Sequence, residues 1–115
     1  MHELGVVLEV VNTVEQFVEE NGVTSRIEKL VLQIGELSSI IPKYVEAVYP
    51  AAVDQTILEN TNLEIEIMPA NALCKECNKV FNAVQNKAIC PECGGKELEL
   101  LSGREFFIKE IIVMD

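Results

Sequence analysis

The chain has 115 residues and a mass of 12.8 kDa, a length that suits one ordinary domain or one domain with a small appended module. Hydrophobic residues make up 49% and charged residues 24%, a balance that is typical of a globular protein and excludes a disordered one. The 19 acidic and 9 basic side chains give a net charge of −10, and no run of 18 apolar residues occurs. We therefore expect neither nucleic-acid binding nor a membrane span.

The negative charge is unevenly distributed along the chain. Residues 72–103 hold as many lysines as glutamates, so the whole net charge of −10 lies outside this segment. Such a charge favours a partner protein with a basic face, or a metal cation. The chain begins MHELGVVLEV, without the basic start of a secretory signal, and we expect a cytoplasmic protein.

Hydrophobic periodicity predicts the first two elements. Residues 4–20 carry apolar side chains at helical spacing, and Asn21-Gly22 suits the helix end because glycine tolerates the left-handed conformation. Residues 27–37 alternate with a period of two, which predicts a strand. The core-facing side of the helix should contain Leu4, Val7, Leu8, Val11, Val14 and Val18.

The later elements follow from the same rules. A second helix should begin near Pro42, since proline suits a first helical turn, and Pro50 is expected to kink or end it. Residues 60–62 mark a turn, residues 63–67 alternate as a strand, and residues 105–113 form a last strand. The core-facing side of the second helix should contain Val45, Val48, Tyr49 and Ala52.

This order of elements predicts an α/β (α+β) fold with two lobes. Two helices on a roughly three-stranded sheet form one lobe, from residues 1–71 and 104–115. The last strand is too apolar to stand alone, so it should return to this sheet. The segment 72–103 is then an inserted, zinc-ribbon-like lobe.

Four cysteines form the strongest motif of the chain. Cys74, Cys77, Cys90 and Cys93 follow the pattern C-x2-C-x12-C-x2-C, in which a tight turn within each pair aims two sulfurs at one point. Four thiolates in a tetrahedron suit zinc. Because four protein ligands leave no open position, this zinc should be structural and not catalytic.

The residues around the cysteines agree with a metal site. Asn78 follows the first pair and Gly94-Gly95 follows the second, and these residue types suit the positive φ that such turns require. Leu98 and Leu100 alternate with glutamates, as in a strand beneath the site. Iron in a rubredoxin-like site is the main alternative, because the same four thiolates hold iron. Disulfides are disfavoured in a reducing compartment.

Met1-His2-Glu3 offers a second set of metal ligands. A lone terminal histidine is most often frayed chain. However, a free α-amine, the amide nitrogen of His2 and its imidazole can close fused chelate rings on one ion, and the amide of Glu3 would complete a plane. Square-planar nitrogen sites favour Ni²⁺ or Cu²⁺. For the Glu3 carboxylate, a contact behind the ligands and a contact to a partner both stay open.

Together these segments resemble the HypA/HybF family of hydrogenase maturation proteins. The resemblance rests on the opening MHEL, on IGELSSIIP at 34–42, on the cysteine module and on the closing IKEIIV, and it covers essentially the whole chain. It implies a nickel metallochaperone with a small α/β nickel lobe and an inserted zinc lobe. It implies nickel held by His2 and the backbone nitrogens of Met1, His2 and Glu3, with structural zinc at the four cysteines.

The resemblance also implies partners. Family members work with the GTPase HypB and deliver nickel to the large subunit of nickel–iron hydrogenase. In some organisms they also serve urease, together with urease maturation proteins. We expect no enzymatic activity, because the sequence has no phosphate loop, no open metal site and no nucleophile motif. We expect a monomer or a weak homodimer.

Two other functions stay open at this point. A zinc-ribbon protein-interaction module shares the cysteines, but it gives no role to Met1-His2-Glu3 and conflicts with the acidic charge. An electron-transfer protein with iron at the four thiolates would absorb visible light, whereas zinc is colourless.

Overall fold

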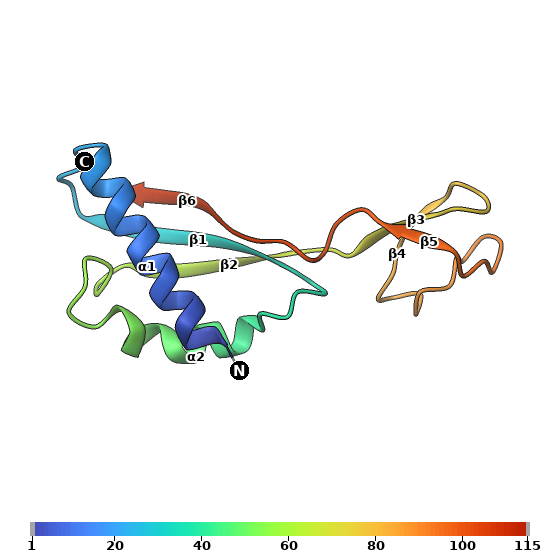
Figure 1. Cartoon of the computed structure of the whole chain (residues 1–115), viewed down its shortest axis with the longest axis horizontal. Helices are drawn as coiled ribbons and strands as arrows, with labels where there is room; N and C mark the ends of the chain where they lie inside the picture. Colours follow the sequence, from blue (N-terminus) through green and yellow to red (C-terminus); the bar gives the residue numbers. More distant parts are fainter. Residues whose placement is uncertain (1, 115) are drawn as a thin grey trace. The chain divides into compact units, whose positions relative to one another are not determined.

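A computed structural model describes residues 2–114. Within these residues the chain forms two helices and two three-stranded sheets (Figure 1). Its internal contacts divide it into two compact units: unit 1 comprises Met1–Gln33, Ile40–Glu66 and Phe107–Asp115, and unit 2 comprises Ile34–Ser39 and Ile67–Phe106. Neither described helix combines the length and the apolarity that a membrane span needs.

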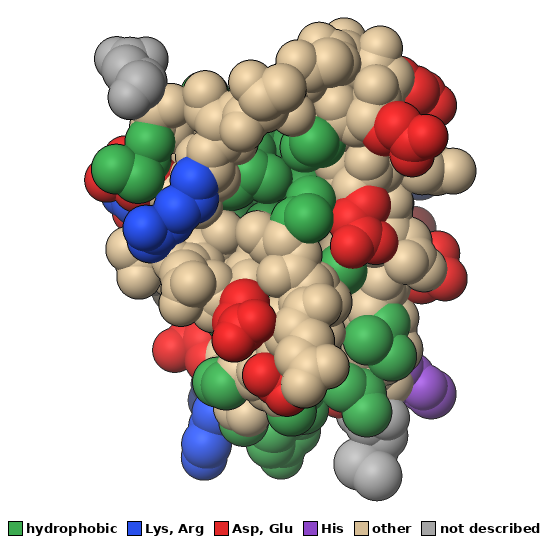
Figure 2. Space-filling model, turned by 90° about the vertical axis from the view of Figure 1, so that its left-hand side faces the viewer, with side chains coloured by type: hydrophobic (Ala, Val, Ile, Leu, Met, Phe, Trp, Pro, Cys, Tyr) green, Lys and Arg blue, Asp and Glu red, His purple; other side chains and the backbone are tan. Residues whose placement is uncertain are grey.

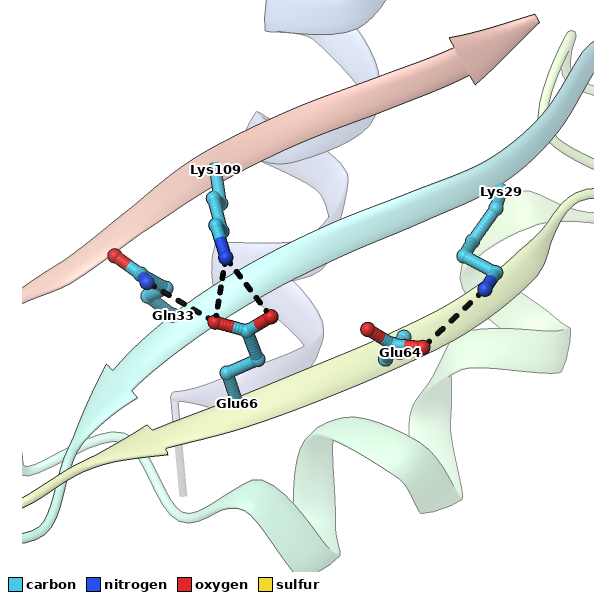
Figure 3. Close-up of polar contacts among 5 residues, drawn as sticks. All are labelled: Lys29, Gln33, Glu64, Glu66 and Lys109. Atoms are coloured by element: carbon cyan, nitrogen blue, oxygen red, sulfur yellow. Dashed lines mark hydrogen bonds and ion pairs between the residues drawn. The ribbon is translucent and has the colours of Figure 1, made fainter.

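The first sheet has the strand order β2-β1-β6. Strand β1 (Ile27–Gly35) is central, with β2 (Asn62–Met68) and β6 (Phe106–Val113) at its sides. The arrows of β1 and β2 point the same way, and that of β6 points the opposite way (Figure 3). The two helices are α1 (Glu3–Glu20) and α2 (Pro42–Val53). The predicted α+β fold with two helices and a three-stranded sheet is therefore confirmed.

The buried face of α1 differs from the prediction. Val7, Val10, Val11 and Val14 are buried, whereas Leu4 and Leu8 are 48% and 44% exposed. The prediction that both leucines face the core is wrong, and Val10 was missed. Apolar residues occupy a wider arc of α1 than its packing partner can bury. The side of the helix that carries Leu8 lies outside the buried part.

Helix α2 buries Val45, Tyr49 and Ala52 as predicted, but Val48 is only half-buried. The helix continues through Pro50 to Val53, so this proline does not end it, and the alternative that it kinks the helix stays a prediction. Proline removes one backbone donor in a helix interior. Here only the last turn follows Pro50, so few hydrogen bonds are affected.

Polar side chains link the three strands on one face of the first sheet, with α1 behind the opposite face (Figure 3). The Lys109 ammonium lies 3.0 Å from both carboxylate oxygens of Glu66, and Gln33 donates to the same carboxylate at 3.1 Å. Lys29 donates to Glu64 at 3.3 Å. The hydrogen bond from Gln33, followed by that from Lys109, lowers the pKa of Glu66. These contacts reinforce the pairing of β1 with its two neighbours.

Unit 2 contains the second sheet, in the antiparallel order β4-β3-β5. Its strands are β3 (Asn71–Cys74), β4 (Val80–Asn82) and β5 (Leu98–Leu100). Phe81 is the one large apolar side chain in the buried cluster around this sheet, so the sheet needs a further source of stability. The buried cluster contains Ala70, Ala72, Cys74, Phe81, Ala83 and Cys90, with Leu98 and Leu100 packed against it.

Unit 2 also includes Ile34–Ser39, which follows from close backbone packing. Gly35 donates to the Glu105 carbonyl at 2.7 Å, and Leu37 donates to the Gly103 carbonyl at 2.7 Å. A Cβ atom on Gly35 would lie 2.1 Å from the Gly103 backbone. Only a glycine fits here. The assignment of residues 1–71 and 104–115 to a nickel lobe, and of 72–103 to a zinc lobe, stays a prediction.

Gly35→Ala should destabilise the protein by at least about 2 kcal/mol, because the new methyl group overlaps backbone atoms that are held by hydrogen bonds. Gly5→Ala is the matched control: its Cβ would meet nothing within 4 Å, and alanine favours the helix by up to about 1 kcal/mol. Urea unfolding of the metal-replete protein measures both. A wild-type unfolding midpoint for Gly35→Ala would contradict the close packing.

Candidate metal centres

The four cysteine sulfurs converge on one point. All four lie within 4.8 Å of one another, and the Cys74–Cys93 and Cys77–Cys90 sulfur pairs are both 3.6 Å apart. Metal–sulfur bonds of about 2.3 Å in a tetrahedron place neighbouring sulfurs about 3.8 Å apart, so the cluster has the size of one four-coordinate ion. All four cysteines are free thiols.

The two cysteine pairs are held by turns with the same hydrogen bonds. The Cys74 carbonyl accepts from Asn78 N–H at 2.8 Å, and the Cys90 carbonyl accepts from Gly94 N–H at 2.9 Å. Asn78 has φ 65° and Gly94 has φ 71°, so the predicted left-handed residues are confirmed at these two positions. Gly95 has no such φ, and a Cβ atom there would lie 2.2 Å from the carboxylate of Glu76, a flexible side chain that can move away.

Backbone N–H groups point at the sulfurs and favour their ionised form. Burial raises the pKa of the Cys90 thiol, but hydrogen bonds from the N–H groups of Cys93 and Glu92 outweigh it and bring the pKa to about 7. The Gly95 N–H lowers the pKa of Cys93, but the neighbouring thiols of Cys74 and Cys77 raise it to about 12. The cluster thus ionises one thiol readily and resists further negative charge.

A cation at the centre of the cluster would stabilise the ionised form of all four thiols. Four thiolates carry four negative charges, and a divalent ion at their centre leaves two. Soft sulfur ligands in a tetrahedron fit Zn²⁺, and they also fit iron. Cys74 and Cys90 are buried while Cys77 and Cys93 are exposed. An ion bound to all four has no open position for substrate, so this centre can support structure but not metal-based catalysis.

The second predicted site lies at the start of α1. His2 is exposed and directly precedes the helix, without a side-chain capping bond. The Val6 N–H donates to the His2 carbonyl at 3.0 Å, so the backbone nitrogens of His2 and Glu3 lie ahead of the helical hydrogen-bond ladder. The imidazole and these two nitrogens thus belong to adjacent residues at one helix end. The predicted ligand Met1 lies outside the described residues.

The Glu3 side chain anchors this end of α1. Only 3% of it is exposed, and its carboxylate accepts a 3.1 Å hydrogen bond from the N–H of Ile41, the residue that precedes α2. The α-amino group, followed by this N–H, lowers the pKa of the Glu3 carboxyl to about 2. Of the two roles left open for Glu3, its burial therefore favours a contact within the protein. No local sequence pattern indicates that Ile41 is its partner.

Glu36, in the segment IGELSSIIP, bonds the first part of this segment to the rest of unit 2. One oxygen of its carboxylate accepts from the Ala70 N–H at 2.9 Å and from the Asn82 side-chain amide at 3.2 Å. These partners are more than thirty residues away in sequence, so no local pattern indicates the contact. Carboxylates therefore hold the segment between Glu36 and Ile41 at both ends. Glu36 bonds at the first end, and the buried Glu3 accepts from Ile41 at the second.

Comparison with known proteins identifies the family. The profile described as "Hydrogenase/urease nickel incorporation, metallochaperone, hypA" matches residues 1–113. This chain belongs to the HypA family. Hydrogenase maturation factor HypA of Streptomyces avermitilis is 35% identical over 96% of this chain and 86% of its own length. The protein of the same name from Chlorobium limicola is 34% identical over 98% of this chain and 97% of its own.

Solved HypA structures share the fold. The solution structure of the nickel metallochaperone HypA from Helicobacter pylori has a TM-score of 0.66, with 22% identity over 99% of this chain and 98% of that one. A second HypA solution structure has a TM-score of 0.70 at 22% identity, over 99% and 97% of the two chains. The predicted family and the predicted fold are both confirmed, and the chain is a member of a metallochaperone family.

Metal removal should loosen unit 2 of this HypA-family chain, because its small core does not replace the four metal bonds. After complete removal, shown by elemental analysis, limited proteolysis should cut within residues 67–106. Cys90→Ala should give the same cuts without a chelator, whereas Gly5→Ala should not. An unchanged proteolysis pattern in the metal-free protein would contradict this dependence.

Proposed function

We propose that this protein is a nickel metallochaperone that binds Ni²⁺ at its N-terminus and delivers it during maturation of nickel–iron hydrogenase. Its ligands are the His2 imidazole and the backbone nitrogens of Met1, His2 and Glu3. The observation that carries the proposal is the exposed His2 at the second position of a HypA-family chain, next to a buried Glu3. The protein is not an enzyme in this proposal, because nickel is its cargo.

The chemistry of the terminus suits a cargo that must leave again. An α-amine, an amide and an imidazole on consecutive residues close fused chelate rings, which supports square-planar Ni²⁺. The imidazole is exposed to solvent, so a receiving protein reaches it directly. Binding displaces protons from the nitrogens, so acid promotes release. The negative charge of unit 1 also attracts the cation, because this unit contains 13 acidic and 4 basic side chains.

Zinc is the ion that we propose for the four cysteines, with a structural role. The sulfur spacing and the closed ligand set support this assignment. Iron in the same cluster is the alternative, with electron transfer as the function. The absorption spectrum of the purified protein separates them, because a four-thiolate iron centre absorbs visible light and a zinc centre does not.

The proposed partners follow from family membership. A HypB-type GTPase acts with the chain, and the hydrogenase large subunit receives the nickel, in the cytoplasm. The family description also includes urease, so urease maturation proteins are a second destination. The competing function is a zinc-ribbon interaction module, which uses the cysteines but assigns nothing to His2. It predicts that the N-terminus has no specific affinity for nickel.

His2→Ala should weaken nickel binding by more than about 100-fold. Removing a residue that only hydrogen-bonds to a metal ligand lowers metal affinity by about 10–100-fold, and removing the ligand itself should lower it further. Calorimetry on untagged protein measures the affinity, and zinc content and thermal unfolding should stay unchanged. Glu9→Ala is the matched control, since it removes an exposed charge from the same helix but no ligand. A wild-type nickel isotherm for His2→Ala would overturn the proposal.

A further inference from the structure

Strand β6 forms a free edge of the first sheet. In the part of the chain that the structure describes, it pairs only with β1, and it lies at the margin of the sheet with α1 behind (Figure 3). Proteins usually protect such an edge with proline, with a bulge or with several charged side chains. Six of the eight residues of Phe106–Val113 are apolar, and none is proline. This edge is therefore able to accept a further strand.

A hollow adjoins the free edge. Thr13, Val14 and Phe17 of α1, together with residues 108–111 of β6, line a cavity of about 320 Å³. Val14 is fully buried at this place, whereas Phe17 is 49% exposed. The cavity has room for one large aliphatic or aromatic side chain. The free edge of β6 and this hollow are together called the β6 groove below.

Acidic side chains flank the β6 groove. On α1, Glu9 and Glu20 lie about one turn to either side of the residues that line the hollow, and Glu110 of β6 lines it; all three are exposed. Figure 2 views unit 1 from the end at which α1 and β6 finish, and it shows hydrophobic side chains among many acidic and few basic ones. A segment bound here would therefore gain affinity from lysine or arginine next to its apolar side chain.

Lys109 is the only cation of β6, and it does not offset this charge. Its ammonium lies 3.0 Å from both oxygens of the Glu66 carboxylate, on the sheet face opposite α1 (Figure 3). The hydrogen bond and the charge of Glu66 raise the pKa of Lys109. Unit 1 has 13 acidic and 4 basic side chains, so a second copy at the same edge would bring two negative units together. A basic segment of another protein is the better match.

We propose that the β6 groove binds an extended segment of a partner protein as a fourth strand of the first sheet. The backbone of the segment pairs with the free side of β6, which provides affinity without regard to sequence. One large apolar side chain fills the hollow, and lysine or arginine neighbours face Glu9, Glu20 and Glu110, which provides selectivity. The site uses neither metal centre, so it goes beyond the proposed nickel function.

A synthetic heptapeptide serves as the probe for the full-length, zinc-loaded chain. It has lysine at every odd position, phenylalanine at the centre and valine at the two remaining positions, so its apolar side chains share one face when it is extended. Calorimetry should show saturable binding of one peptide per chain. Alanine in place of the central phenylalanine should weaken binding by about tenfold, and glutamate in place of the lysines should abolish it.

Variants of the protein locate the bound peptide. Phe17→Ser should weaken binding by about tenfold or more, because Phe17 forms one wall of the hollow. Glu110→Lys should weaken it several-fold, since it places a cation beside the lysines of the peptide. Leu8→Ser is the matched control, because Leu8 is 44% exposed on the same helix but does not line the groove. In NMR hydrogen exchange, amides on the free side of β6 should exchange more slowly in the complex.

Nickel isotherms keep this inference apart from the nickel proposal, since Phe17→Ser and Glu110→Lys should bind nickel as the wild type does. The groove would be overturned by a lack of saturable binding of the lysine peptide, by an equal loss in Leu8→Ser, or by unchanged exchange of the β6 amides. It would also be overturned if sedimentation showed a wild-type dimer that Phe17→Ser dissociates, because the groove would then hold a second copy.

Discussion

Four cysteine sulfurs that lie within 4.8 Å of one another cannot all carry charge unless a cation sits among them. The second sheet depends on that constraint, because the buried cluster around it contains alanines, two cysteines and a single phenylalanine. Unit 1 depends on it through the chain order. Strand β6 completes the first sheet only after the chain has passed through the cysteine segment, and an ordered segment lowers the entropy cost of bringing its ends together.

The proposed nickel site is built in the opposite way. Its ligands are consecutive groups at one end of the chain, and no rigid cage surrounds them. The side chain beside these ligands is fixed in place, because the buried Glu3 carboxylate joins the start of α1 to the start of α2 through the N–H of Ile41. In our proposal, a structural ion is enclosed by four side chains, while the cargo ion is bound at an anchored but accessible helix end. This contrast explains why one ion would be retained and the other delivered.

Sequence periodicity predicts the elements well, because each one has a single dominant spacing. The strand at 63–67 and the helix beginning at Pro42 both appear within a residue of their expected positions. The cysteine spacing predicts the sulfur cluster, since two C-x2-C turns have few ways to converge. Leu4 and Leu8 were misplaced because α1 has apolar residues over a wide arc, and only the packing partner selects which part is buried.

Contacts between distant segments are the part that local patterns do not contain. Glu36 bonds to Ala70 and Asn82, and Gly35 meets the backbone of Gly103, yet neither contact has a periodic or spacing signal. The family resemblance marked the segment IGELSSIIP without explaining it. The structure supplies the explanation: Gly35 permits backbone contact, the Glu36 carboxylate bonds to residues 70 and 82 within unit 2, and the N–H of Ile41 donates to the Glu3 carboxylate.

In our proposal, one small chain holds two metal ions in chemically different centres. X-ray absorption at the zinc and nickel edges of a single nickel-loaded sample observes both centres at once. We expect zinc with four sulfur neighbours at about 2.3 Å and nickel with nitrogen and oxygen neighbours but no sulfur. Sulfur in the nickel shell, or a zinc shell that lacks four sulfurs, would contradict the division into a structural cysteine centre and a separate N-terminal cargo site.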